Sequence, residues 1–122
     1  EHAIEHALSA YHPALPHGAG LIMISKAYWS RFMESSGDRL IAIARALGRT
    51  DADKPEDFID ALADLQKRCN VHELRLSGYG VQPSDFGKIA DNAIDTMGGL
   101  FRVDPRTLSR EDIIGILTDS YK

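Results

Sequence analysis

The sequence predicts an all-α protein, a compact bundle of about five or six helices. Apolar residues recur at the three- and four-residue spacing of an α-helix along most of the 122 residues, and the alternation typical of strands persists nowhere. Prolines and glycines punctuate these segments where helices commonly begin and end. Helices of this kind bury their apolar stripes against one another, so we expect one helical domain over residues 1–122.

The first half of the chain holds the segment that we expect at the centre of the bundle. Residues 2–11 carry good helix formers and are followed by a proline. A second helix is expected from about Pro16, and its stretch LIMISKAYWSRFM is apolar on nearly all sides, which is typical of a buried helix. After a break at residues 35–37, helical spacing resumes, and Gly48 suits a C-terminal cap. The apolar stripe there is Leu40, Ile43, Ala44 and Leu47.

The middle of the chain is expected to hold a helix that begins at Pro55, because proline is favoured at the first helical position. Four apolar side chains recur there at helical spacing, which places the last of them, Cys69, in the core rather than in a reactive role. They are Phe58, Leu62, Leu65 and Cys69. Residues 70–81 contain two glycines without regular spacing, and we expect a loop.

Two further helices are expected in the last third of the chain. Pro83 restarts the helical pattern and Gly98 ends it, with a stripe of Phe86, Ile89, Ala90, Ala93, Ile94 and Met97. A turn is expected at Pro105, because proline disfavours helical geometry in the residue before it. Ser109 then resembles an N-cap with Asp112 three residues later. The apolar face of this last helix is Ile113, Ile114, Leu117 and Tyr121.

The composition is that of an ordinary soluble globular chain, with 43% hydrophobic residues, 26% charged residues and a net charge of −4. Lys and Arg do not cluster, so we expect no nucleic-acid partner. The longest apolar run is interrupted by Lys26 and Arg31, so no membrane span is expected. A single cysteine cannot form an internal disulfide, and no signal peptide is apparent. Both observations favour a reduced, cytoplasmic location.

The chain begins with Glu1-His2 inside an expected helix, without an initiator methionine or a capping residue ahead of it. This start is typical of a piece of a longer polypeptide whose upstream part is missing. Such a piece exposes apolar surface that once met the rest of the protein, and exposed apolar patches promote association. We therefore expect a homo-oligomer rather than a monomer.

Four of the five histidines crowd into residues 2–20. His2 and His6 are four residues apart, so on a helix they lie on one face with Cβ atoms about 6 Å apart. His17 follows Pro16 and precedes Gly18, and a helix-turn-helix arrangement can bring His2 and His17 together. Two imidazoles so placed can hold one metal ion, although a catalytic metal usually has three or more protein ligands and an open position.

Two other interpretations of this segment stay open. HAIEH matches H-x-x-E-H, the inverted zinc-peptidase signature, in which the two histidines bind zinc and Glu5 acts as the general base. That interpretation needs a third ligand downstream, for which Glu73 is the candidate. Alternatively, the histidines are incidental to a non-catalytic helical interaction module. Gly18 and Gly20 fit close approach to a ligand and tight helix packing about equally well.

The segment HAIEHALSAYHPALPHGAGLIMIS resembles the C-terminal, helical half of the iron-containing (metal-dependent) alcohol dehydrogenases. That family carries a His-x-x-x-His helix, a short turn, then Pro-His-Gly and an apolar helix. LSGYGVQPSDFGKIADNAI and DPRTLSREDIIGIL are similar to later segments of the same family, so the resemblance covers nearly the whole chain. It implies the all-α C-terminal domain of the dehydroquinate synthase-like fold.

The resemblance also implies roles for individual residues. His2 and His17 correspond to metal ligands, and His6 to the histidine near nicotinamide and substrate that assists proton transfer or cofactor placement. The metal would be Fe(II) or Zn(II), acting as a Lewis acid on the oxygen of a small alcohol or aldehyde. Hydride would pass between that substrate and NAD or NADP.

Some features of the family lie outside the match or differ from it. The remaining ligands, an Asp and a His, and the nucleotide-binding domain lie upstream of the matching region, so we expect the chain alone to be inactive. The turn from His2 to His17 is one residue longer than is usual, and Asp104 stands where the family usually has Asn. His12 and His72 match no functional residue of the family.

Overall fold

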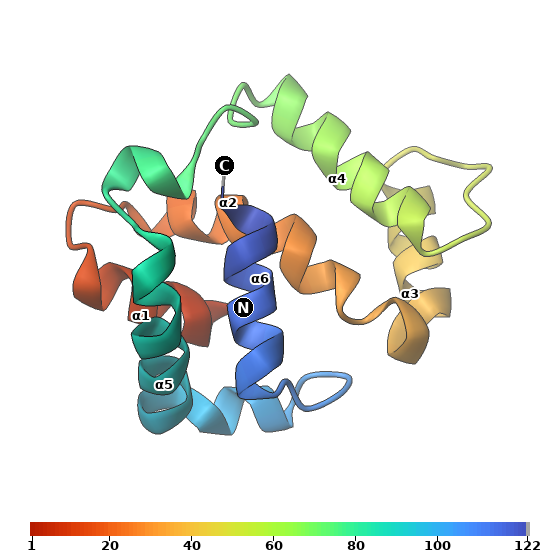
Figure 1. The fold of residues 1–122 in the computed structure, drawn as a ribbon. Coiled ribbons are helices and arrows are strands. Elements are labelled where there is room, and N and C mark those ends of the chain that lie inside the picture. Colours follow the sequence, from red (N-terminus) through yellow and green to blue (C-terminus); the bar gives the residue numbers. More distant parts are fainter. Residues whose placement is uncertain (122) are drawn as a thin grey trace.

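The computed structural model describes residues 1–121, which form six α-helices, three short 3-10 helices and no strand (Figure 1). The α-helices are α1 (His2–Tyr11), α2 (His17–Ser30), α3 (Met33–Ala46), α4 (Glu56–Arg68), α5 (Phe86–Met97) and α6 (Arg110–Ser120). The 3-10 helices are η1 (Leu76–Tyr79), η2 (Pro83–Asp85) and η3 (Gly98–Arg102). The predicted all-α bundle is confirmed. Within these residues, no helix has the length and apolar character needed to cross a membrane.

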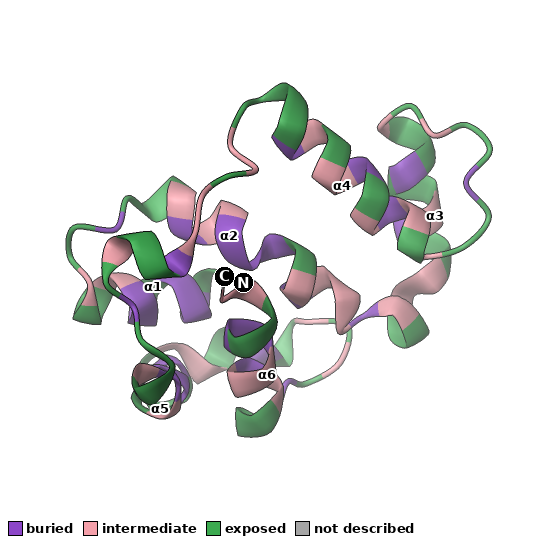
Figure 2. Cartoon of the chain, turned by 45° about the horizontal axis from the view of Figure 1, so that its top comes forward, coloured by how far each residue is buried: buried purple, intermediate pink, exposed green. Residues whose placement is uncertain are grey.

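The helices pack into two apolar clusters that share α2. The larger cluster joins α1, α2, α5 and α6, and the smaller one lies mainly between α3 and α4 (Figure 1). Figure 2 shows buried residues on the facing sides of these helices and exposed residues on their outer sides. Trp29 on α2 packs against both clusters. The segment expected at the centre of the bundle therefore does connect its two parts.

Gln66 attaches α4 to α2 by hydrogen bonds in a buried position. Its Nε2 donates to the carbonyl of Ile22 and to Oγ of Ser25, both at 3.0 Å.

The prediction that Cys69 lies in the core was wrong, because Cys69 is exposed. The helix ends at Arg68, and Asn70 takes a left-handed backbone conformation with φ of 56°. Cys69 lies at the open groove between α4 and α2, which Leu65 and Ile22 also line.

The predicted apolar stripes are buried only where a neighbouring helix covers them. On α3, Leu40 and Ala44 are buried, but Ile43 is 40% exposed because α3 packs mainly on α4. On α5, the expected stripe is buried except near its end, where Ile94 is 37% exposed. On α6, Ile116 is fully buried although the sequence pattern did not single it out, because α2 and α5 both pack against this helix.

Helix boundaries follow local chemistry closely. The expected break near residues 35–37 is a kink inside α3, where Ser36 has non-helical φ and ψ of −142° and 24°. Gly48 follows α3 with φ of 101°, a left-handed conformation that suits glycine. Pro55 is the N-cap of α4 rather than its first residue. A short 3-10 helix, η2, fills the stretch between Pro83 and the start of α5.

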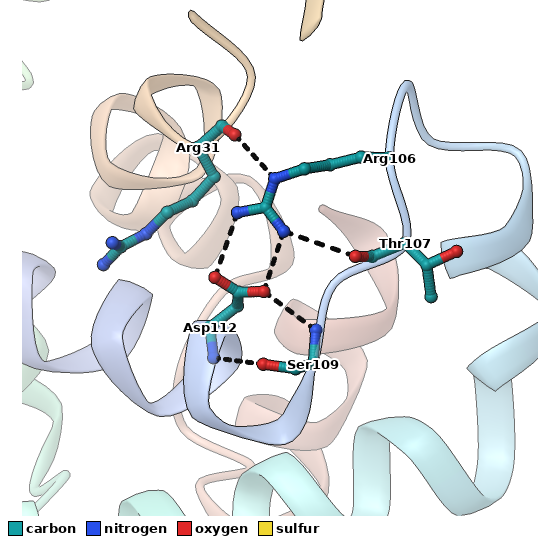
Figure 3. Close-up of polar contacts among 5 residues, drawn as sticks. All are labelled: Arg31, Arg106, Thr107, Ser109 and Asp112. Carbon is teal, nitrogen blue, oxygen red and sulfur yellow. Dashed lines mark hydrogen bonds and ion pairs between the residues drawn. The ribbon is translucent and has the colours of Figure 1, made fainter. Parts of the chain in front are cut away.

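The start of α6 is anchored to the end of α2 (Figure 3). Ser109 and Asp112 form a capping box, in which each side chain accepts from the backbone N–H of the other at 3.1 Å and 2.9 Å. Arg106 donates to both carboxylate oxygens of Asp112 at 2.8 and 3.0 Å, and its Nε donates to the carbonyl of Arg31 at 3.1 Å. One carboxylate therefore links a cap, a loop and a second helix.

This linkage predicts acid-sensitive stability. The bonds from Arg106, followed by the Ser109 amide, lower the pKa of Asp112 well below its usual range despite partial burial. The stability contributed by a group with a depressed folded-state pKa is present above the unfolded pKa, about 3.9 for Asp, and is lost as pH falls below it. We expect Asp112→Asn to lower the free energy of unfolding at neutral pH by about 1–2 kcal/mol.

The measurement is urea unfolding from neutral to acidic pH, with Asp51→Asn as the control because Asp51 is exposed. Asp112→Asn should lose less of its stability on acidification than the wild-type chain does, whereas Asp51→Asn should follow the wild-type curve. An unchanged acid dependence in Asp112→Asn would contradict the prediction.

Candidate metal centre

Helix α1 carries two exposed histidines and, between them in the sequence, a buried carboxylate. His2 and His6, one turn apart, are exposed, whereas Glu5 between them is fully buried. The neighbouring apolar residues Ile4 and Leu8 are also fully buried against the larger cluster. This burial fixes the rotation of α1 about its axis. The face that carries His2 and His6 therefore points outward, and Glu5 points towards α2.

His17 is the first residue of α2 and faces the histidines of α1. Pro16, with φ and ψ of −65° and 135°, ends the turn and sets the helix start. The ring centroid of His17 lies 5.4 Å from that of His2 and 5.3 Å from that of His6, and His2 and His6 are 6.5 Å apart. The turn thus brings together the three histidines that the sequence singled out.

The carboxylate of Glu5 lies beneath these rings. Its Oε2 is hydrogen-bonded to Nδ1 of His17, and its Oε1 accepts from Oγ of Ser9 at 2.5 Å. A Cβ on Gly20 would lie 2.8 Å from Cγ of Glu5 and 3.0 Å from its Oε1, whereas a Cβ on Gly18 would meet nothing within 4 Å. Gly20 is therefore explained by tight packing against a charged side chain, and Gly18 is not.

The donor set suits a divalent cation. Glu5, His6 and His17 each offer a ligand atom within 4.8 Å of the others, which makes them the one such group within residues 1–121. Imidazole nitrogen and carboxylate oxygen are ligands for both Zn(II) and Fe(II). The side chain of His17 is 51% exposed, so a cation there would keep positions open towards solvent. His2 lies beside this group, at the ring distance given above.

The other residues considered from the sequence lie apart from this group. Glu73 is exposed and its Oε1 lies 3.1 Å from Nε2 of His72. His12 caps the end of α1, with Nε2 3.4 Å from Asp85. The zinc-peptidase alternative gains no support from this arrangement, because a general base must reach a water molecule and both oxygens of Glu5 are buried and already bonded.

The role of Glu5 beside His17 was missed from the sequence. Charged residues on helices are usually exposed to solvent, so the spacing of apolar residues predicts no buried contact for Glu5. The only partner considered for it was the water molecule that a zinc peptidase activates. The available signal was the glycine at position 20, since a glycine inside a helix marks close approach of another group.

Solved structures of one enzyme resemble this fold closely. The archaeal halo-thermophilic Red Sea brine pool alcohol dehydrogenase ADH/D1, bound to NZQ, matches with a TM-score of 0.87 and 27% identity. A histidine-to-alanine mutant of ADH/D1 matches with a TM-score of 0.84 and 28% identity. Both matches cover 98% of this chain and 32% of the other, so the chain spans about a third of their length. No curated relative matches the chain by sequence.

The family comparison covers the described chain from end to end. The model for the C-terminal region of the Fe-containing alcohol dehydrogenase family matches residues 1–121. That match includes the three clustered histidines, the helix α2 and the capped helix α6. The chain therefore belongs to the Fe-containing alcohol dehydrogenase family, to whose C-terminal region it corresponds.

Proposed function

We propose that this chain is the helical part of a metal-dependent alcohol dehydrogenase that interconverts small alcohols and aldehydes with NAD or NADP. The cluster of His2, His6 and His17 at the α1–α2 corner carries the proposal. Family membership and the likeness to ADH/D1 support it. Because the chain spans 32% of ADH/D1, we propose that the nucleotide-binding part and further metal ligands come from additional polypeptide.

In this proposal, His2 and His17 bind Fe(II) or Zn(II). The two residues come from different helices, so the rigid α1–α2 contact fixes their separation. When bound, the metal supplies Lewis-acid polarisation of the substrate oxygen. Imidazole binds metal only when it is neutral, so protons compete with the metal and binding weakens in acid.

We assign the catalytic role to His6. Its ring is exposed beside the proposed ligand His17, with the centroids 5.3 Å apart and the planes at 86°. This position lets it exchange a proton with substrate or contact the nicotinamide, although its ring also offers a ligand atom close to those of Glu5 and His17. Its one-turn offset from His2 keeps both side chains on the same exposed face of α1.

The ligand assignment predicts that loss of His2 and His17 weakens metal binding. Co(II) added to the 122-residue chain should shift the imidazole NMR signals of these residues, and His2→Ala with His17→Ala should lower the affinity at least about tenfold. His72→Ala is the matched control, because His72 lies outside the cluster. Wild-type affinity in the double variant would rule out these two ligands.

If further ligands and the nucleotide-binding part come from additional polypeptide, activity should depend on the length of the chain that is assayed. Under anaerobic Fe(II), the 122-residue chain should show no turnover of NAD(P)H with an aldehyde. A longer polypeptide that carries a nucleotide-binding part should turn over, and His6→Ala should lower its kcat about a hundredfold, because positioned proton transfer contributes about 10²–10⁴. Metal-dependent turnover by the 122-residue chain would show that no further polypeptide is required.

A further inference from the structure

We infer that Glu5 is a positioning residue whose buried carboxylate holds the His17 ring with its Nδ1 protonated and its Nε2 lone pair free for a metal. The metal part of this inference rests on the proposed function. The hydrogen-bonding part rests on the contacts between α1 and α2 alone.

A carboxylate in this place requires strong partners. Glu5 is 0% exposed, and an ionised group removed from water is costly unless it is hydrogen-bonded. Within residues 1–121 its oxygens are bonded by Oγ of Ser9 and Nδ1 of His17. Ser9 is one turn along the same helix, so His17 is the partner that comes from another element. The hydrogen bond between Glu5 and His17 therefore crosses the α1–α2 contact.

The bond determines which nitrogen of His17 is free. A carboxylate accepts hydrogen bonds, so the inference assigns Nδ1 as the donor to Oε2. In a neutral imidazole the other nitrogen, Nε2, then carries the lone pair. The side chain of His17 is 51% exposed, so the ring reaches the surface. Carboxylates that accept from the non-ligating nitrogen of a metal-bound histidine fix both ring orientation and tautomer.

The missing side chain at Gly20 makes this geometry possible. A Cβ there would lie 2.8 Å from Cγ of Glu5. Glu5 is buried and makes two hydrogen bonds, so a small shift of its side chain cannot remove this clash. Gly18 lies two residues earlier in the same helix, and a Cβ there would meet nothing within 4 Å. The two glycines thus form a matched pair, in which a methyl group displaces Glu5 at one position only.

The first experiment measures the His17 tautomer directly. Long-range ¹H–¹⁵N NMR spectra of the metal-free, 122-residue chain, recorded where the imidazoles are neutral, distinguish protonated Nδ1 from protonated Nε2. We expect protonated Nδ1 in the wild-type chain. Glu5→Met fills the space without an acceptor and should shift His17 towards protonated Nε2. A purely structural role for Glu5 would leave the tautomer unchanged.

The second experiment measures Zn(II) affinity of the same chain by competition with a chromophoric chelator. We expect Glu5→Met and Gly20→Ala to lower the affinity about tenfold to a hundredfold, the usual effect of removing such a partner. Gly18→Ala should keep wild-type affinity. Circular dichroism establishes that each variant is folded, and Glu5→Met tests the inference independently if Gly20→Ala does not fold.

The outcomes separate this inference from the proposed function. Protonated Nε2 in the wild-type chain, or an unchanged tautomer in Glu5→Met, would overturn the inference. So would wild-type Zn(II) affinity in folded Glu5→Met. The expected tautomers together with no Zn(II) binding by the wild-type chain would overturn the metal site, while supporting the positioning bond.

Discussion

The candidate site depends on a fully buried carboxylate between two helices. Glu5 cannot be solvated, so α1 and α2 must stay close enough for His17 to bond it and for Gly20 to pack against it. That requirement sets the distance between the helices at the turn. It also places the first residue of α2 beside the exposed face of α1, where His2 and His6 lie. The positions of the three imidazoles therefore follow from the burial of this carboxylate together with the burial of Ile4 and Leu8, which fixes the rotation of α1.

Helix α2 is held from its middle to its end by polar contacts. Gln66 bonds its middle, and Arg106 bonds the carbonyl that follows its last turn. Between them the hydroxyl of Tyr28 donates to Asp104 at 2.6 Å, and burial together with this bond raises the pKa of Tyr28. Asp104 is thus a hydrogen-bond acceptor for a buried tyrosine. These contacts join α2 to α4 and to the segment that precedes α6.

Much of the fold could be predicted from the sequence, because helix ends are set by local chemistry. Gly48 and Ser109 acted as the expected caps, and the short turn before His17 indicated that the histidines would meet. The burial of individual side chains was predicted less well, since it depends on which helix packs against them. Cys69 and Ile43 have suitable spacing but no helix covers them. The contact of Glu5 with His17 was beyond periodicity, because it arises only where two helices from separate segments approach closely.

The contrast between the buried and exposed sides of the site bears on how the region could serve a larger enzyme. Glu5 bonds His17, and Ser9 and Gly20 in turn contact Glu5. All of these residues belong to α1 and α2. The contacts that we infer to orient that ring are therefore made within α1 and α2. His2, His6 and His17 lie on the exposed side, and in the proposed function further ligands and a nicotinamide approach from there. A His17 ring that is already held by the buried carboxylate of Glu5 would lose little conformational entropy when it binds a metal. This is the physical advantage of a buried carboxylate at this position.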